Sequence, residues 1–184
     1  MLPTEIETER LLLRPYTFDD VDDVYAYAKD PEWGEYLPVP SPYKRQDAEY
    51  FVALHQLKDR NLKNQWAIQL NGTVVGGIDL NFVRDDHAIA EFHWSIGKEY
   101  WGQGIMTEAG LALRDLAFQS VPSLNRIQSH AAIGNIGSWR VMEKVGLSRE
   151  GVLKQSWKAR DGWFDMVWYA LLRPEWEQLT GGAK

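Results

Sequence analysis

Two glycines separated by a single residue, Gly102 and Gly104, stand where the sequence changes from a strand-like to a helix-like pattern. The strand-like run ends at Gly97 and the helix-like run begins at about Ile105. Glycine lets the backbone turn tightly and leaves no side chain between its N–H group and a ligand. The first turn of a helix adds unpaired N–H donors and a partial positive charge, both of which attract phosphate. The segment therefore predicts a site for a ligand that carries a diphosphate.

Two better-known phosphate motifs do not fit this segment. A P-loop requires Gly-Lys-Ser/Thr, whereas Gly104 is followed by Ile105 and Met106. A dinucleotide fingerprint requires a third glycine three residues after the second, and that position is Thr107. On these residues alone, a plain strand-to-helix turn that needs glycine only for its dihedral angles stays open.

A second group of reactive side chains lies on the strand-like run before the glycines. Glu91, His93 and Ser95 alternate with apolar residues and therefore share one face of a strand. Because histidine titrates near neutral pH, His93 is a candidate general base. A solvent-facing glutamate and a structural histidine are the alternatives for this pair of side chains.

Composition limits the class of protein. The chain has 184 residues, which favours one domain with a sizeable core. A formal net charge of −6 argues against nucleic acid as the main partner and is compatible with a cationic amine substrate. The absence of cysteine excludes disulfides, thiolate metal sites and a cysteine nucleophile. No metal is expected, because His55, His87 and His130 show no metal-ligand spacing.

The N-terminal residues and the hydropathy pattern bear on location. Residues 1–10 contain no apolar core of signal-peptide length, and no run approaches the roughly 20 apolar residues of a membrane span. We therefore expect a cytoplasmic protein that does not contact membranes.

Hydrophobic periodicity predicts one mixed sheet of about seven strands flanked by about four helices, an α/β (α+β) arrangement. The predicted strands are 10–14, 66–70, 74–82, 89–97, 126–133, 153–158 and 163–172. The predicted helices are 21–28, 41–59, 105–120 and 136–145. Asn71-Gly72 and Asp161-Gly162 are hairpin signals. Ser41-Pro42 is typical of a helix start, Gly146 of a helix end, and the tail after Trp176 is expected to fray.

Four motifs in this order resemble the GNAT superfamily of acetyl-CoA-dependent N-acetyltransferases. The first, Trp101-Gly102-Gln103-Gly104, follows the fourth strand. Asn135-Ile136-Gly137-Ser138 and the following 141–147 resemble the family's Asn-x-x-Ser helix and its Glu-Lys-x-Gly-Phe end. The opening, 4–14, and the end, 169–176, resemble the RimJ/RimL-type branch, named for ribosomal-protein N-terminal acetyltransferases. Since the resemblance covers about residues 5–177, we expect 1–184 to be a single acetyltransferase domain.

The resemblance implies acetyl-CoA as co-substrate, with its pantetheine arm between a fourth and a fifth strand that splay apart. It also implies that backbone amides around the glycines hold the pyrophosphate. These amides belong to Trp101, Gly102, Gln103, Gly104, Ile105, Met106 and Thr107. Asn135 matches the family's Asn that contacts cofactor or ordered water, and a helix N-cap is a compatible alternative. Arg140 and Lys144 are candidates for the 3′-phosphate, although a solvated helix face explains them as well.

The reaction implied is direct attack of an amine on the thioester, with backbone N–H groups of the fourth strand polarising the carbonyl. Ser138 matches the position proposed to protonate the leaving thiolate, whereas Met142 stands where many relatives have a Tyr for that step. A capping role in the first helical turn is the alternative for Ser138. An acid on the fourth strand is a common base in the superfamily, which adds Glu91 to His93. In some close relatives the base is a Glu at the position of Trp157 here, so a water relay stays open.

The pKa of the acceptor's ammonium group limits which kind of amine can react easily. At pH 7 about a tenth of an α-amine is neutral, against under about 0.1% of a lysine amine. We therefore expect a peptide or protein N-terminus. A small amine such as a polyamine, amino acid or aminoglycoside, a CoA-binding regulatory module without turnover, and a nucleotide-binding domain of another class are the alternatives. Trp33, Tyr36 and Trp157 are candidate acceptor-binding residues by resemblance, and a homodimer is expected.

Overall fold

Eight strands and five α-helices make up most of the computed structural model, which describes residues 2–57, 63–159 and 162–181. The strands are β1 (Ile6–Glu7), β2 (Leu11–Arg14), β3 (Lys63–Leu70), β4 (Thr73–Phe82), β5 (Ile89–Ile96), β6 (Arg126–Ala132), β7 (Ser148–Ala159) and β8 (Gly162–Leu172). The α-helices are α1 (Val21–Ala28), α2 (Arg45–Leu57), α3 (Ile105–Ser120), α4 (Ile136–Lys144) and α5 (Arg173–Leu179). Two short 3-10 helices are η1 (Phe18–Asp20) and η2 (Lys98–Tyr100).

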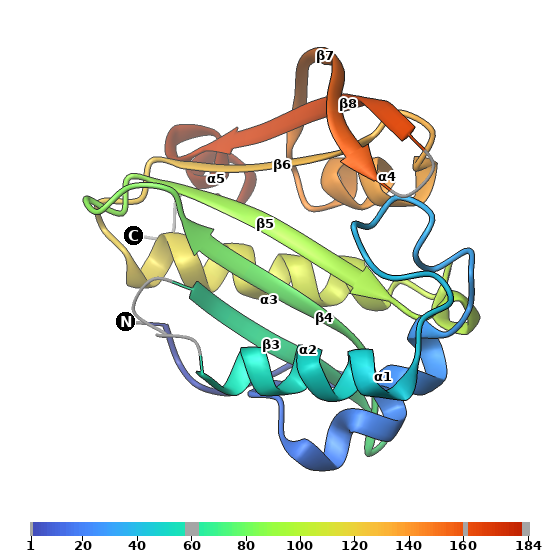
Figure 1. Ribbon diagram of the computed structural model, residues 1–184. Helices are drawn as coiled ribbons and strands as arrows, with labels where there is room; N and C mark the ends of the chain where they lie inside the picture. Colours follow the sequence, from blue (N-terminus) through green and yellow to red (C-terminus); the bar gives the residue numbers. More distant parts are fainter. Residues whose placement is uncertain (1, 58–62, 160–161, 182–184) are drawn as a thin grey trace.

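All strands belong to one sheet with the order β1-β2-β3-β4-β5-β6-β8-β7. Every neighbouring pair is antiparallel except β5 and β6, which are parallel. Helices α1 and α2 cover one face of the sheet, and α3 lies behind the other face (Figure 1). The expected mixed α/β fold is confirmed. None of the described helices combines the length and the apolar character needed to cross a bilayer.

Two clusters of buried side chains hold the layers together. The larger cluster lies between the sheet and α3–α5, and its fully buried members include Trp66, Phe92 and Phe118. The smaller cluster lies under α1 and α2 and includes Val24 and Val52. Burial of such apolar side chains contributes about 25 cal/mol per Å². Because Phe92 points into the larger core, its neighbours Glu91 and His93 point to the opposite face, as the alternation predicts.

The start of α2 and the number of strands differ from the prediction. An eighth strand, β1, pairs two residues with Leu12 and Leu13, a length too short to leave a periodic pattern. Helix α2 begins at Arg45, not at Ser41-Pro42, whose peptide bond is cis. The carboxylate of Asp47 accepts a hydrogen bond from the backbone N–H of Lys44 at 2.8 Å, which fixes the later start. The predicted end near residue 59 lies outside the described residues.

The C-terminal part is more ordered than expected. The backbone N–H of Leu172 donates to the Glu175 carboxylate at 2.8 Å, and this starts α5 instead of a frayed tail. Trp176 is buried and stacks on Phe118 with ring centroids 5.1 Å apart, which docks the helix on α3. The predicted β7–β8 hairpin is confirmed by the pairing of Ala159 with Gly162, whereas Asp161 lies outside the described residues.

Candidate functional site

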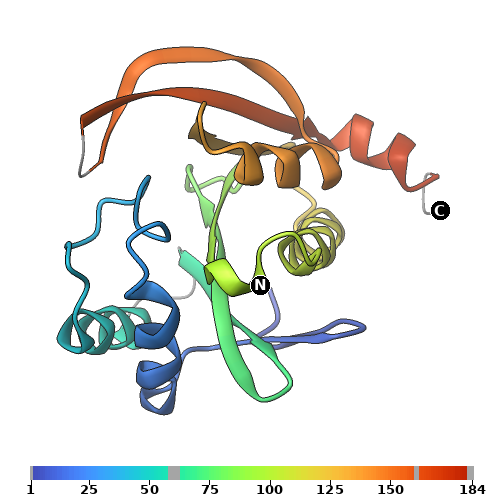
Figure 2. The same cartoon turned by 90° about the vertical axis from the view of Figure 1, so that its right-hand side faces the viewer.

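The sheet opens between β5 and β6. The two strands pair only through Ile89–Arg126, Ala90–Ile127 and Glu91–Gln128, and beyond these pairs they diverge. The hydroxyl of Ser129 donates to the carbonyl of Phe92 at 2.9 Å just past the last pair. Figure 2 shows the separation, with β6, β8 and β7 on one side and β4 and β5 on the other. The predicted splay between the fourth and fifth predicted strands is confirmed.

Backbone groups of β5 beyond the last residue paired with β6 face this opening. The carbonyl of Phe92 accepts from Ser129, and the carbonyl of Ile96 accepts from the indole N–H of Trp101 at 3.0 Å. Backbone groups of alternate residues leave a strand on the same side, so the N–H of Trp94, midway between them, also points into the opening. A backbone donor is therefore available beside any group that enters between the strands.

The glycine turn precedes α3 and presents a row of amide donors. Gly102 (φ 74°) and Gly104 (φ 77°) both have left-handed backbone conformations, which explains the need for glycine at both positions. Within the part of the chain that the structure describes, the backbone N–H groups of residues 102–107 donate no hydrogen bond. The side-chain amide of Gln103 donates to the carbonyl of Glu99 at 2.8 Å and steadies the turn. Six consecutive donors at a helix N-terminus suit the pyrophosphate of CoA.

Arg10 supports this turn from the other side, and sequence reasoning missed it. Its guanidinium donates to the carbonyl of Gln103 at 3.1 Å and to the carboxylate of Glu108, in the first turn of α3, at 2.6 Å. Glu108 also accepts from the hydroxyl of Thr8 at 2.6 Å. Burial acts to raise the pKa of Glu108, but the bonds from Thr8 and Arg10 outweigh it and lower that pKa below its ordinary value. The start of β2 thus anchors the start of α3.

Helix α4 places Ser138 against β5. The side chain of Asn135 caps the helix by accepting from the backbone N–H of Ser138 at 3.2 Å, so the capping role predicted for Asn135 is confirmed. The hydroxyl of Ser138 accepts a hydrogen bond from the indole N–H of Trp94 at 3.1 Å. An indole N–H can only donate, so the hydrogen of the Ser138 hydroxyl remains available to another acceptor.

The remaining α4 positions fall on two faces. Met142 is fully buried in the larger core and has no proton to donate. Arg140 and Lys144 are exposed one helical turn apart. Their face is compatible with the expected contact to a 3′-phosphate, which remains a prediction.

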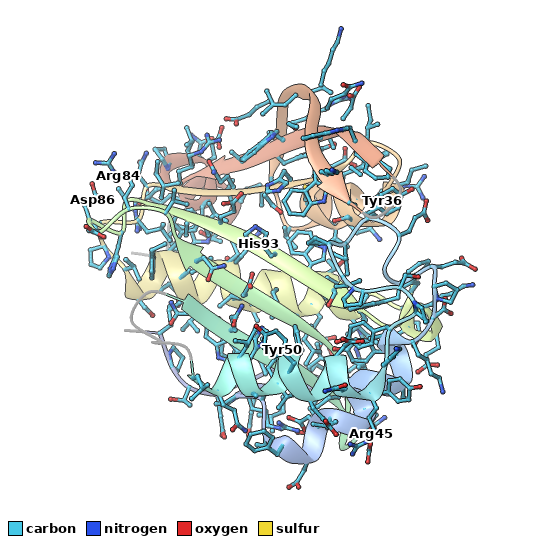
Figure 3. The ribbon with its side chains drawn as sticks, in the orientation of Figure 1. Tyr36, Arg45, Tyr50, Arg84, Asp86 and His93 are labelled. Carbon is cyan, nitrogen blue, oxygen red and sulfur yellow. The ribbon has the colours of Figure 1, made fainter. Side chains whose placement is uncertain are left out.

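On the opposite face of β5, four titratable side chains form a chain of contacts. His93 Nδ1 lies 3.2 Å from Asp79 Oδ1, and His93 Nε2 lies 3.9 Å from Glu91 Oε1. Glu91 Oε1 in turn lies 2.9 Å from Nδ1 of His130 on β6. Burial acts against both charged forms, yet His130 and His93 lower the pKa of Glu91, and Asp79 and Glu91 raise that of His93. Figure 3 shows His93 on this face, next to the opening.

Aromatic residues line one side of this titratable chain. The indole N–H of Trp157 donates to the backbone carbonyl of Tyr36 at 3.1 Å, which joins β7 to the loop between α1 and α2. The ring of Tyr36 meets that of Phe164 edge-on at 5.4 Å, and Trp157 lies 6.1 Å from His130. The structure therefore brings together Tyr36, labelled in Figure 3, and Trp157, two of the predicted acceptor residues.

Trp33, the third predicted acceptor residue, lies elsewhere. Its ring packs between Tyr27 at 5.6 Å and Tyr43 at 5.7 Å, against the core under α1 and α2. Its direct contact with an acceptor stays a prediction.

A separate shallow hollow of about 580 Å³ lies between η1 and α2. Its lining residues are Phe18, Val21, Arg45, Gln46, Glu49, Tyr50 and Ala53. Arg45 and Tyr50 are on α2, apart from His93 (Figure 3). The hollow contains neither the glycine turn nor the titratable chain, so we assign the chemistry to the opening between β5 and β6.

Comparison with known proteins agrees with this arrangement. Residues 10–148 match the family model for the acetyltransferase (GNAT) domain. YnaD of Bacillus subtilis (strain 168), an uncharacterized N-acetyltransferase, is 31% identical over 171 residues, 93% of this chain and 98% of YnaD. A GNAT-family acetyltransferase structure from Bacillus anthracis has 28% identity and a TM-score of 0.80, covering 92% of this chain and 99% of that one.

Two further relatives match a part of the chain. YdaF of Bacillus subtilis (strain 168), whose name classes it provisionally as a ribosomal N-acetyltransferase, is 38% identical over 113 residues, 58% of either chain. Spermidine N(1)-acetyltransferase of Escherichia coli (strain K12) is 29% identical over 109 residues, 57% of this chain and 58% of that enzyme. The two names concern different acceptors, and the two proteins are similar to this chain over comparable lengths.

Proposed function

The chain belongs to the GNAT acetyltransferase family, and from that premise we propose that it moves the acetyl group of acetyl-CoA directly to the α-amine of a peptide or protein N-terminus. The observation that supports the donor half is a row of six amides, residues 102–107, that donate to no group of the described residues and lie beside a sheet that opens. The expected cytoplasmic location and homodimer remain predictions.

Acetyl-CoA supplies the thioester, and residues on both sides of the opening hold it. The amides from Gly102 to Thr107 bind its pyrophosphate. The N–H of Trp101, which was also predicted to do so, instead donates to the carbonyl of Lys98 at 3.1 Å. Asn135 contacts the donor or a water that bridges to it. Arg140 and Lys144 attract the 3′-phosphate from the exposed face of α4. With the arm between β5 and β6, the N–H of Trp94 polarises the thioester carbonyl.

In the transfer step the amine nitrogen attacks the carbonyl carbon and the carbon–sulfur bond breaks. The hydroxyl of Ser138 gives its proton to the thiolate, because the bond from Trp94 leaves that hydrogen available. Glu91 takes the proton that the amine loses, directly or through a water, and His93 is the second candidate for this step. Asp79 holds the ring of His93 from behind at 3.2 Å.

The acceptor proposal rests on amine acidity and on the site beside the opening. An α-amine is neutral more than about a hundred times as often as a lysine amine at pH 7, so it demands less of the base. Trp157, whose ring lies 6.1 Å from that of His130 and whose indole N–H is bonded to the backbone of Tyr36, lines the side of the site where the amine's substituent lies. A small polyamine is the second candidate, favoured by the similarity to spermidine N(1)-acetyltransferase.

A CoA-release assay with matched acceptors tests the proposal. Three acceptors are compared. The first is a peptide with a free N-terminus, and the second is the same peptide with a blocked N-terminus and a lysine side chain. The third is spermidine. We expect kcat/KM for the free N-terminus to exceed the other two at least tenfold. A preference for spermidine would make a polyamine the proposed acceptor. No CoA release with any of the three acceptors would contradict the proposed function.

A further inference from the structure

Three side chains that share no sequence motif converge at the opening of the sheet. Glu91 and His93 come from β5, and His130 comes from β6. One potential ligand atom from each lies within 4.8 Å of the others, with Glu91 Oε1 in the middle, 2.9 Å from His130 Nδ1 and 3.9 Å from His93 Nε2. Spacing along the sequence conceals this cluster, because it depends on the parallel pairing of β5 with β6.

These distances suit a tetrahedral metal ion. With bonds of about 2.0–2.1 Å, the donor atoms around zinc lie about 3.3 Å from one another. The two separations at Glu91, 2.9 Å and 3.9 Å, lie on either side of that value, so rotation of side chains suffices to close the site. Two imidazoles and one carboxylate are a ligand set that zinc accepts, whereas magnesium and calcium prefer oxygen donors alone.

The surrounding residues orient two of the ligands. The carboxylate of Asp79 holds Nδ1 of His93 at 3.2 Å, which directs Nε2 of that ring toward Glu91. The ring of His130 stacks on Trp168 with centroids 4.5 Å apart, which fixes its plane. The side chain of His93 is 43% exposed, so an ion has a path from solvent and a fourth position open to water.

We propose that Glu91, His93 and His130 form a binding site for one divalent transition-metal ion, with zinc as the best match to the ligand set. Binding itself does not depend on the proposed acetyl transfer. A consequence does rest on it: a metal on Glu91 occupies the lone pairs that accept the amine's proton, so zinc inhibits the transfer. The cluster then makes the enzyme sensitive to free zinc.

Metal binding is tested on tag-free full-length protein stripped with a chelator. Zinc chloride is titrated calorimetrically, cobalt(II) is followed by its visible absorption, and magnesium chloride serves as the hard-ion comparison. We expect one zinc per chain, tetrahedral cobalt bands that zinc abolishes, and no response to magnesium. The absence of saturable zinc binding up to millimolar concentration would overturn the proposal.

Variants locate the ion. Glu91→Gln, His93→Ala and His130→Ala are each expected to weaken zinc binding at least tenfold, and Asp79→Asn about tenfold through its hold on His93. His87→Asn is the matched control, since it removes a histidine outside the cluster, and it should bind zinc unchanged. Calorimetry with CoA confirms that each variant is folded. Zinc affinity that is equal in all variants would overturn the assignment.

The proposal and the proposed function fail separately. Acetyl transfer by a protein that binds no zinc rejects the metal site and keeps the acetyltransferase. Zinc bound at the three ligands of a chain without turnover rejects the acetyl transfer and keeps the site.

Discussion

The two sides of the opening between β5 and β6 are built in different ways. The proposed donor side uses backbone amides of one short segment, residues 102–107, and helix α4, in which the cap Asn135 and Ser138 are three residues apart. The acceptor side is assembled from side chains on different elements, and the contact between Tyr36 and Trp157 spans 121 positions. Recognition by backbone amides depends on the glycines and on the few side chains that hold the turn, whereas the acceptor side depends on each of its side chains.

The largest effect is expected on the acceptor side, at Glu91. Glu91→Gln keeps the size of the side chain and removes the proposed base, so kcat should fall about 10²-fold or more. The KM for acetyl-CoA should stay unchanged, because Glu91 lies on the face opposite Ser138 and α4. Steady-state kinetics measure both values, with Glu177→Gln on α5 as the control. A rise in the KM for acetyl-CoA with kcat preserved would contradict the division between the two sides.

The donor side should respond in the opposite way. Gly104→Val places a β-branched residue at a φ of 77°, which L residues disfavour by about 1–2 kcal/mol. The same change covers the amides at the start of α3, so CoA binding measured by calorimetry should weaken at least about tenfold. Gly151→Val is the matched control, because a Cβ at Gly151 meets nothing within 4 Å. Equal CoA affinity in both variants would count against the amide site.

Trp94 holds the hydroxyl of Ser138, and a smaller effect is expected there. Trp94→Phe keeps an aromatic ring but removes the N–H that holds the Ser138 hydroxyl, so kcat should fall about 3- to 10-fold. In a Ser138→Ala background the same change should add little, since the bond is already absent. Trp163→Phe, at an exposed tryptophan, is the control. Fully additive losses would show that Trp94 acts independently of Ser138.

The smallest effect concerns the anchor of the glycine turn and appears as a pH dependence. Burial opposes the charge of Glu108, but bonds from Thr8 and Arg10 lower its pKa in the folded state below the ordinary 4.5. The stability from these bonds is therefore complete above about pH 4.5 and is lost as pH falls through the lowered value. Glu108→Gln should reduce unfolding free energy by about 1 kcal/mol at pH 7 and by less at pH 3.

Urea denaturation of wild type and Glu108→Gln at both pH values measures that difference, with Glu177→Gln as the control. A difference in stability that grows toward pH 3 would contradict the assigned role of Glu108.

The parts of the molecule that were predictable from sequence are those encoded by neighbouring residues. Periodicity located the strands and helices, and Gly146 ends α4 with a φ of 92° as expected. Strand β1 was missed because two residues cannot form a period. Helix α5 was missed because its stability depends on Trp176 meeting Phe118, a contact between distant positions.

The same distinction separates the two halves of the candidate site. The glycine turn and the Asn135 cap are local signals, and both were predicted. The pairing of Arg10 with Glu108 depends on β2 lying against α3, so no spacing rule reveals it. The meeting of His130 with Glu91 depends on the register of two strands that are parallel for only three residue pairs.

Amide resonances of residues 102–107 in a ¹⁵N-labelled protein provide the most direct test of the donor site. Titration with CoA should shift these resonances in a saturable manner, whereas pantetheine, which lacks the diphosphate, should leave them nearly unchanged. If CoA binds while these amides keep their positions and other residues respond, the diphosphate is held elsewhere and the account of the opening is wrong.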